Sequence, residues 1–509
     1  KPADLLGERM IPTAFIVNKK GLRNIARIKP FTLFLLGLVV SCGAFFAQPT
    51  VTHAEEDITA IAKKMGTTLK ADGIPKAAIV VDADSGEILW SQQPDLAWNP
   101  ASIAKVMTMY LAFEAMEQGK FTMDTTVTAT QKDVDISKIY AISNNKITLG
   151  VAYPVRELLK MIAVPSSNVA TLMLANLISG NQPTDFVHLM NQKAAELGMT
   201  NTTYYNCSGA QASAFNGLYQ MQGIDPNGDN VSTARDLASL TYHFLKNYPE
   251  ILEITNKPVV KTMVGTPYEE TFEAYNYSLP GAKYGYQGVD GLKTGSSPTG
   301  GFNYIATVKQ GDFRLIEVIL GVGNWQNQDG EYERHVAGNA LLDYAYTTYE
   351  RKKLLDKGPQ TIDHKKVTLA NDLYGVIPKG SQPTFKLVAG QVQVDTPLTL
   401  LNSTVQAPKV AYQEVKPKQT TAEAAEESNE HSGDTTVAEP NHFIPKSIAT
   451  SVLVLFGLIF SVITRQLQKR LERQKKHGKE SSKTAAMRTI FLSAAVLSFL
   501  CAVGLFLLF

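Results

Sequence analysis

The sequence Asn99-Pro100-Ala101-Ser102-Ile103-Ala104-Lys105 has the features of a helix start. Asn99 is a favourable N-cap residue, and Pro100 suits the first helical position. Apolar residues follow at helical spacing with few charges between them, so we expect this helix to be largely buried. Ser102 and Lys105 are three positions apart, which places a hydroxyl and an amine on one helix face. The amine can accept the hydroxyl proton if burial or a neighbouring cation lowers its pKa from about 10.4.

This Ser-x-x-Lys pattern is weak by itself, because Ser143-Asn144-Asn145-Lys146 has the same form. The second match lies in a polar stretch without helix caps, and it predicts a solvated loop. The first match also has a plain alternative, which is an ordinary buried helix with a lysine that reaches the surface. Other motifs must decide between these readings.

The second motif lies in the segment Gly288-Val289-Asp290-Gly291-Leu292-Lys293-Thr294-Gly295, which holds the only Lys-Thr-Gly of the chain. A strand that presents Lys293 and Thr294 suits a substrate carboxylate and an oxyanion. Gly295 would permit a close approach of another backbone segment. The alternative is a glycine-rich turn with an exposed lysine.

The third motif, Ser166-Ser167-Asn168, precedes a predicted helix at residues 169–178. Residues 143–145 and 179–181 also fit Ser-x-Asn. We favour Ser166 because a helix start offers a fixed position and free N–H donors, whereas Ser179 lies where the same helix should stop. The alternative role for this serine is plain N-capping.

Composition restricts the class of protein. With 44% hydrophobic and 19% charged residues, the 509-residue chain is typical of a globular protein with attachments. A net charge of +2 argues against nucleic acid as a partner. The three cysteines, Cys42, Cys207 and Cys501, are too scattered for a disulfide framework or a cysteine metal site.

Both ends of the chain have membrane-type composition. Residues 1–54 contain a basic segment, an apolar run at 31–47 and then Thr52-His53-Ala54, which predicts a signal peptide cleaved after Ala54 or, as the alternative, an uncleaved anchor. Residues 444–464 and 489–509 are apolar and near the roughly 20 residues that span a bilayer. The loop between them, 465–488, is strongly basic and should stay cytoplasmic, which places everything before residue 444 outside. A buried soluble helix is the alternative for residues 489–509.

The exported part divides into three segments. Strand-like runs and helical patterns alternate from residue 55 to residue 351 and predict an α/β or α+β unit of catalytic size. Residues 352–415 hold short β-type runs, including 384–388, 391–394 and 398–401, and predict a small all-β domain. Residues 416–443 have too few apolar residues to fold and predict a disordered stalk.

Ser-x-x-Lys, Ser-x-Asn and Lys-Thr-Gly in this order resemble the signature of penicillin-binding proteins and serine β-lactamases. Residues 99–102, 190–199, 232–238 and 288–295 are similar to segments of the low-molecular-mass D-alanyl-D-alanine carboxypeptidases. The resemblance covers residues 55–410. It implies an α+β, β-lactamase/transpeptidase-like catalytic domain and a small all-β domain, held at the extracellular face of a bacterial cell membrane. Family members commonly attach by one amphipathic C-terminal helix, whereas the apolar runs at 444–464 and 489–509 of this chain predict two transmembrane helices.

The resemblance also implies roles for particular residues. Ser102 would be the nucleophile and Lys105 its base, with Ser166 relaying or positioning a proton. Lys293 would bind the substrate carboxylate and lower the pKa of Lys105 by its like charge. Asn168 would hold the substrate amide, and Thr294, Gly295 and Ser296 would also bind substrate. The backbone N–H of Ser296 would form an oxyanion hole together with that of Ser102.

The implied reaction removes the terminal D-alanine from a peptidoglycan stem pentapeptide through an acyl-enzyme. β-Lactam antibiotics such as penicillin would acylate the same serine, and neither a metal nor an organic cofactor would be needed. Two residues depart from the family pattern, because Ala104 stands where threonine is usual and Val169 where aspartate commonly follows the asparagine.

Three other functions remain open. A β-lactamase of class A type would need a Glu-x-x-Leu-Asn element after Asn168, and residues 196–200 do not fit it. A D,D-transpeptidase would differ only in its acceptor, an amine in place of water. A membrane β-lactam sensor would need a cytoplasmic effector, for which only the basic loop at 465–488 is present.

Overall fold

The computed structural model describes residues 56–415 of the chain. The predicted signal peptide, stalk, membrane spans and basic loop lie outside these residues. Within residues 56–415, no helix combines the length and the apolar character that a membrane crossing requires.

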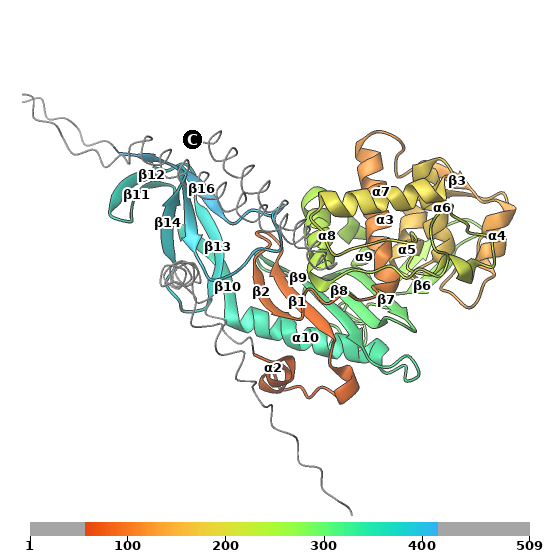
Figure 1. The fold of residues 1–509 in the computed structure, drawn as a ribbon, viewed down its shortest axis with the longest axis horizontal. Helices are drawn as coiled ribbons and strands as arrows, with labels where there is room; N and C mark the ends of the chain where they lie inside the picture. The colour runs from red at the N-terminus through yellow and green to blue at the C-terminus, as the bar shows by residue number, and fades with distance from the viewer. Residues whose placement is uncertain (1–55, 416–509) are drawn as a thin grey trace, which may run out of the picture. The chain divides into compact units, whose positions relative to one another are not determined.

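A five-stranded antiparallel sheet is the centre of the catalytic domain, with the strand order β2-β1-β9-β8-β7 (Figure 1). Its strands are β1 (Ala77–Asp82), β2 (Ile88–Gln92), β7 (Val289–Ser297), β8 (Gly301–Gln310) and β9 (Phe313–Val322). The strand predicted to carry Lys293 and Thr294 is therefore confirmed, and it forms an edge of the sheet.

Both faces of the sheet are covered. In β1, Ala77, Ile79 and Val81 belong to the core on one face, whereas Ala78 and Val80 belong to the core on the other. This alternation explains why every residue of β1 is buried. The helices α2 (Ile58–Lys64) and α10 (Gly330–Thr348) lie on one side of the sheet, and the remaining helices lie on the other (Figure 1).

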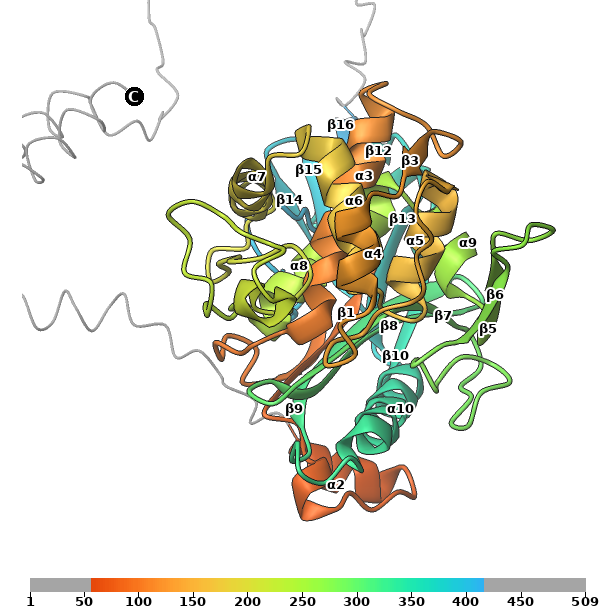
Figure 2. The same ribbon diagram turned by 90° about the vertical axis from the view of Figure 1, so that its right-hand side faces the viewer.

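The helical layer faces the viewer in Figure 2. It consists of α3 (Lys105–Glu117), α4 (Gln131–Ser137), α5 (Val155–Ala163), α6 (Asn168–Ser179), α7 (Pro183–Glu196), α8 (Ala234–Asn247) and α9 (Ile251–Thr255). Two small ribbons flank it, β3 (Thr126–Thr128) with β4 (Ala152–Pro154), and β5 (Val259–Thr262) with β6 (Glu270–Glu273). Short 3₁₀ turns complete the layer, η2 (Ala71–Gly73), η3 (Ala101–Ala104) and η4 (Ala212–Phe215). The helix predicted at 169–178 is confirmed as α6.

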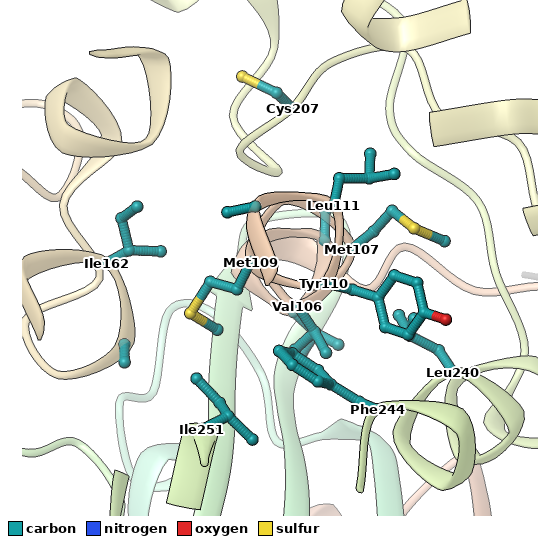
Figure 3. Close-up of a cluster of buried hydrophobic side chains, with 14 of the residues drawn as sticks. Val106, Met107, Met109, Tyr110, Leu111, Ile162, Cys207, Leu240, Phe244 and Ile251 are labelled. Carbon is teal, nitrogen blue, oxygen red and sulfur yellow. The ribbon is translucent and has the colours of Figure 1, made fainter. Parts of the chain in front are cut away.

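The helix α3 runs through the middle of this layer, surrounded by apolar side chains from α5, α8 and α9 (Figure 3). Tyr110 meets the ring of Phe244 edge-on, with 5.5 Å between centroids. A helix that is apolar on all sides is stable only inside a core. The prediction of a largely buried helix is confirmed, and this packing holds the N-terminal end of α3 in a fixed position.

A second group of strands follows the catalytic domain. The ribbon of β10 (Tyr349–Leu355) and β13 (Leu373–Pro378) adjoins a sheet ordered β11-β12-β16-β15-β14. The strands of that sheet are β11 (Gly358–Ile362), β12 (Lys365–Leu369), β14 (Thr384–Val388), β15 (Gln391–Asp395) and β16 (Lys409–Glu414). They share a small core of their own, which includes Val367, Val392 and Val410.

The prediction of a strand at residues 398–401 within this β-domain was wrong. The segment instead lies against the β1–β2 turn, where Ile88 N donates to Thr399 O at 2.8 Å and Leu401 N donates to Gly86 O at 3.0 Å. Leu401 and Val405 are buried in the core of the catalytic domain. Because these two side chains are buried there, the segment does not pair with the β-domain sheet. It connects the β-domain to the core of the catalytic domain.

Candidate active site

Ser102 lies on η3, a single 3₁₀ turn that leads into α3. The sequence predicted a regular helix from Pro100, and this detail needs correction. Ala101 has φ of +51°, a left-handed conformation that costs a non-glycine residue energy and breaks the helix before Lys105. The Asn99 side chain still accepts a hydrogen bond from Ala101 N at 2.8 Å, which supports the turn.

Lys105 points from the first turn of α3 toward Ser102. Its Nζ lies 2.9 Å from Ser102 Oγ, 2.8 Å from Asn168 Oδ1 and 2.7 Å from the carbonyl oxygen of Ser208. Ser208 was not among the residues that sequence reasoning selected. The three contacts surround the amine and fix its position.

Burial lowers the pKa of Lys105 from 10.5 to about 7, because the charged amine loses its hydration. The sequence predicted that burial or a neighbouring cation lowers this pKa, with Lys293 contributing by its like charge. Burial is the main cause at Lys105. At Lys293 burial is again the main cause, and the like charge of Lys105 helps to hold its pKa well below the usual range. An amine with a pKa near 7 is available as a base at neutral pH.

Ser166 lies next to Lys293. Lys293 Nζ donates to Ser166 Oγ at 2.9 Å and to the carbonyl oxygen of Thr294 at 2.9 Å. The N-cap of α6 is the neighbouring Ser167, whose side chain accepts from Ala170 N. The Ser166 hydroxyl therefore does not cap the helix. It instead accepts the hydrogen bond from Lys293.

Asn168 begins α6 and is almost fully buried. Its Oδ1 accepts from Lys105, while its Nδ2 donates to Ser143 O at 2.9 Å. The sequence predicted that Asn168 holds the substrate amide. In the structure both halves of its side-chain amide contact protein groups, so it holds Lys105 in place.

Gly295 brings β7 directly against the turn that carries Ser102. Thr294 is buried beside it, and Ser296 follows with a partly exposed side chain. A Cβ atom at Gly295 would lie 3.0 Å from Ser102 N. The backbone N–H groups of Ser102 and Ser296 are thus on adjacent segments, as a pair of oxyanion donors requires.

Arg334 of α10 is a second residue that sequence reasoning missed. It is buried, and its Nη1 donates to Ser296 Oγ at 3.0 Å and to Asn303 O at 3.2 Å. Burial lowers its pKa to about 10, and its positive charge contributes to the lowered pKa of Lys293. Nothing in the local sequence of α10 connects Arg334 with a strand some forty residues earlier.

The described residues contain no group of three or more His, Cys, Asp or Glu side chains placed to hold a metal ion.

Residues 65–324 match the family model described as D-alanyl-D-alanine carboxypeptidase. The chain belongs to this family. It is a serine-type peptidase, and the carboxypeptidase function predicted from the sequence is confirmed. Residues 351–413 match a family described as a domain of unknown function (DUF1958).

Several relatives support this membership. D-alanyl-D-alanine carboxypeptidase DacF of Bacillus subtilis is 30% identical over 294 residues, which are 57% of this chain and 67% of DacF. The structure of a peptidoglycan synthesis regulatory factor, PBP3, from Streptococcus pneumoniae is 28% identical, with a TM-score of 0.57, and the match covers 67% of this chain and 99% of that one. Penicillin binding protein 5 from Haemophilus influenzae is 25% identical, with a TM-score of 0.52, and the match covers 67% and 95%. The expected penicillin-binding, transpeptidase-like fold with a C-terminal all-β domain is confirmed.

Proposed function

We propose that Ser102 is the nucleophile and Lys105 its general base in the removal of the terminal D-alanine from a peptidoglycan stem pentapeptide. The observation that carries this proposal is the set of contacts around Lys105 Nζ. Its neighbours Asn168 Oδ1 and Ser208 O are acceptors only, so they take the two hydrogens of a neutral amine. The amine lone pair is then left for the Ser102 hydroxyl at 2.9 Å.

The reaction proceeds in two steps. Ser102 Oγ attacks the carbonyl carbon of the penultimate D-alanine as its proton passes to Lys105. The C–N bond then breaks, the departing D-alanine takes up a proton on its amine, and the shortened peptide remains as an ester of Ser102. Water hydrolyses this ester, with the backbone N–H groups of Ser102 and Ser296 stabilising the oxyanion in both steps.

Lys293 and Ser296 bind the terminal carboxylate of the peptide. Ser296 can offer its hydroxyl because Arg334 donates to the same oxygen at 3.0 Å. A carboxylate beside Lys293 favours the charged amine and offsets the lowering of its pKa by burial. Ser166, at 2.9 Å from Lys293, passes the proton to the leaving D-alanine.

β-Lactam antibiotics acylate Ser102 by the same route. The site geometry supports this, since a cyclic amide with a neighbouring carboxylate presents the groups that Ser102 and Lys293 recognise. Two of the related solved structures support it further, because one is named as a penicillin binding protein and the other carries the abbreviation PBP3.

The test uses the full chain and its Ser102→Ala variant. The unaltered chain is expected to release D-alanine from a pentapeptide ending in D-Ala-D-Ala and to bind labelled penicillin covalently, whereas the variant should do neither. Ser403→Ala is the control, because this serine is exposed and has no part in the proposed site. Penicillin labelling that persists in Ser102→Ala would contradict the assignment. Adding an amine acceptor to the same assay measures transpeptidation.

The domain organisation forms part of the proposal. A signal peptide at 1–54 precedes a catalytic domain at 55–351 and a β-rich domain at 352–415, which a stalk at 416–443 joins to two transmembrane helices at 444–464 and 489–509. The basic loop at 465–488 supports a cytoplasmic position between the helices. In intact cells, Ser432→Cys should react with a membrane-impermeant maleimide and Ser481→Cys should not. The opposite pattern would reverse the topology.

A further inference from the structure

The loop of residues 138–149 lines a groove that adjoins the site described above through Asn168. Tyr140 at 92% and Leu149 at 56% are among the most exposed large apolar side chains of the described residues. Both line a groove of about 620 Å³. Apolar side chains that gather at a concave surface mark a binding site more often than isolated ones do.

The groove has a definite chemical character. Its lining includes Lys138 and Lys146, both exposed, and contains no aspartate or glutamate. Lys138 is 3.8 Å from Asp135, a weak surface ion pair, so its charge is available to a ligand. The groove therefore favours a ligand with negative charge and with an apolar face for Tyr140.

Asn145 adds an open hydrogen-bond acceptor beneath the groove. Its side chain is 6% exposed, and its Nδ2 donates to Glu270 Oε2 at 3.1 Å. Its Oδ1 has no hydrogen-bond partner among the described residues. An unpaired buried acceptor costs free energy that a ligand N–H or O–H would recover after a small shift of the loop.

The groove is connected to the catalytic base by consecutive hydrogen bonds. Ser143 O accepts from both the backbone N and the Nδ2 of Asn168, at 2.8 and 2.9 Å. Asn144 Oδ1 accepts from Val169 N at 2.9 Å. Asn168 Oδ1 in turn accepts from Lys105. A ligand that contacts the loop is thus linked by hydrogen bonds to the group that holds Lys105.

We propose that this groove binds the acidic, N-acetylated sugar-and-peptide part of a peptidoglycan strand, remote from its D-Ala-D-Ala end, and positions Lys105 through Ser143 and Asn168. The inference rests on the acyl-serine function proposed above. Carboxylates along the strand meet Lys138 and Lys146, a sugar face packs on Tyr140, and an N-acetyl N–H reaches Asn145. Binding energy from a remote part of the substrate is then used at the reacting centre.

The experiment compares two substrates of the full chain. One is a disaccharide-pentapeptide, and the other is a tripeptide that ends in D-Ala-D-Ala and lacks the disaccharide, its N-acetyl groups and the upstream carboxylates. For Tyr140→Ala and for Lys146→Glu, kcat/KM should fall about tenfold on the disaccharide-pentapeptide and stay within about twofold on the tripeptide. Tyr374→Ala, a change at a 45% exposed tyrosine of β13, should alter neither.

A second measurement separates binding from turnover. Ser102→Ala should bind the disaccharide-pentapeptide about tenfold more weakly when it also carries Lys146→Glu. An equal loss of kcat/KM on both substrates, or no loss on either, would contradict the proposal that the groove binds the substrate. Failure of the unaltered chain to hydrolyse even the tripeptide would overturn the acyl-serine function itself.

Discussion

The carbonyl oxygen of Pro100 occupies the space that a side chain at Gly295 would need. A Cβ atom there would lie 2.5 Å from Pro100 O and 2.9 Å from Ile103 N, both of which are backbone atoms. Neither can move without a change in the turn that carries Ser102. The strand β7 and the turn η3 are therefore in contact along their backbones, and the position of the nucleophile depends on a glycine.

Gly295→Ala should lower kcat/KM for D-alanine release about a hundredfold, because the methyl group displaces Ser102 and its N–H. The rate of acylation by labelled penicillin should fall in parallel. Circular dichroism and thermal unfolding check that the variant still folds. A folded Gly295→Ala enzyme with unaltered kinetics would show that the turn tolerates a shift of the backbone.

The pH dependence of the reaction should report the state of Lys105. With a pKa lowered to about 7, the amine is protonated and unable to act as a base at pH 5, and it becomes neutral as the pH rises. We therefore expect kcat/KM to increase with pH through about 7 and then to level. Stopped assays of D-alanine release across this range measure the profile.

Lys105→Arg provides the matched test. A guanidinium keeps its proton at all accessible pH values, so activity should fall at least about a thousandfold and show no recovery at higher pH. If Lys105→Arg keeps the same increase of kcat/KM with pH, another group causes that increase and Lys105 is not the base.

Arg334→Met should weaken recognition of the carboxylate. The change removes the donor at 3.0 Å from Ser296 Oγ, so the hydroxyl that faces the substrate loses its fixed orientation. KM for a D-Ala-D-Ala peptide should rise about tenfold, with a smaller change in kcat. Arg334→Lys, which retains one charged donor, should recover part of the loss. A fall in kcat with unchanged KM would indicate a role in the chemical step.

Local pattern was sufficient for much of the site. Helical spacing placed Ser102 and Lys105 on one face, and a glycine within a strand-like run marked the close approach at Gly295. The helix α6 was predicted within one residue at each end, because a continuous apolar run ends there at a glycine.

The local sequence pattern could not predict contacts between residues that are far apart in the chain. Ser208 contacts Lys105 across about a hundred residues, and Arg334 reaches Ser296 from a different layer of the fold. The left-handed conformations of Ala101 and Ser166 have no sequence signal, because neither residue type favours positive φ. The segment 398–401 shows the same limit, because its β-type composition could not reveal which domain it packs against.

Glu317 should lower the stability of the protein above neutral pH. It lies in β9 facing α10, where a Cβ atom at Gly338 would be 2.5 Å from Glu317 Oε2, and both of its carboxyl oxygens lack hydrogen-bond partners among residues 56–415. Burial raises its pKa from 4.5 to about 8. The folded protein thus keeps a proton that the unfolded chain releases above pH 4.5, and stability is lost as the pH rises toward 8.

Glu317→Met removes this cost with a side chain of similar size. The variant should gain roughly 1–3 kcal/mol at pH 8 or above, and less near pH 5, where the unfolded carboxyl is itself largely protonated. Thermal unfolding of both proteins at pH 5, 7 and 8.5 measures the difference. Glu414→Met is the control, because this glutamate is 58% exposed in a surface ion pair with Lys365 and should show no such gain. A stability difference that is constant across pH would mean that Glu317 keeps the same protonation state in the folded and unfolded chain, and that its effect comes from packing alone.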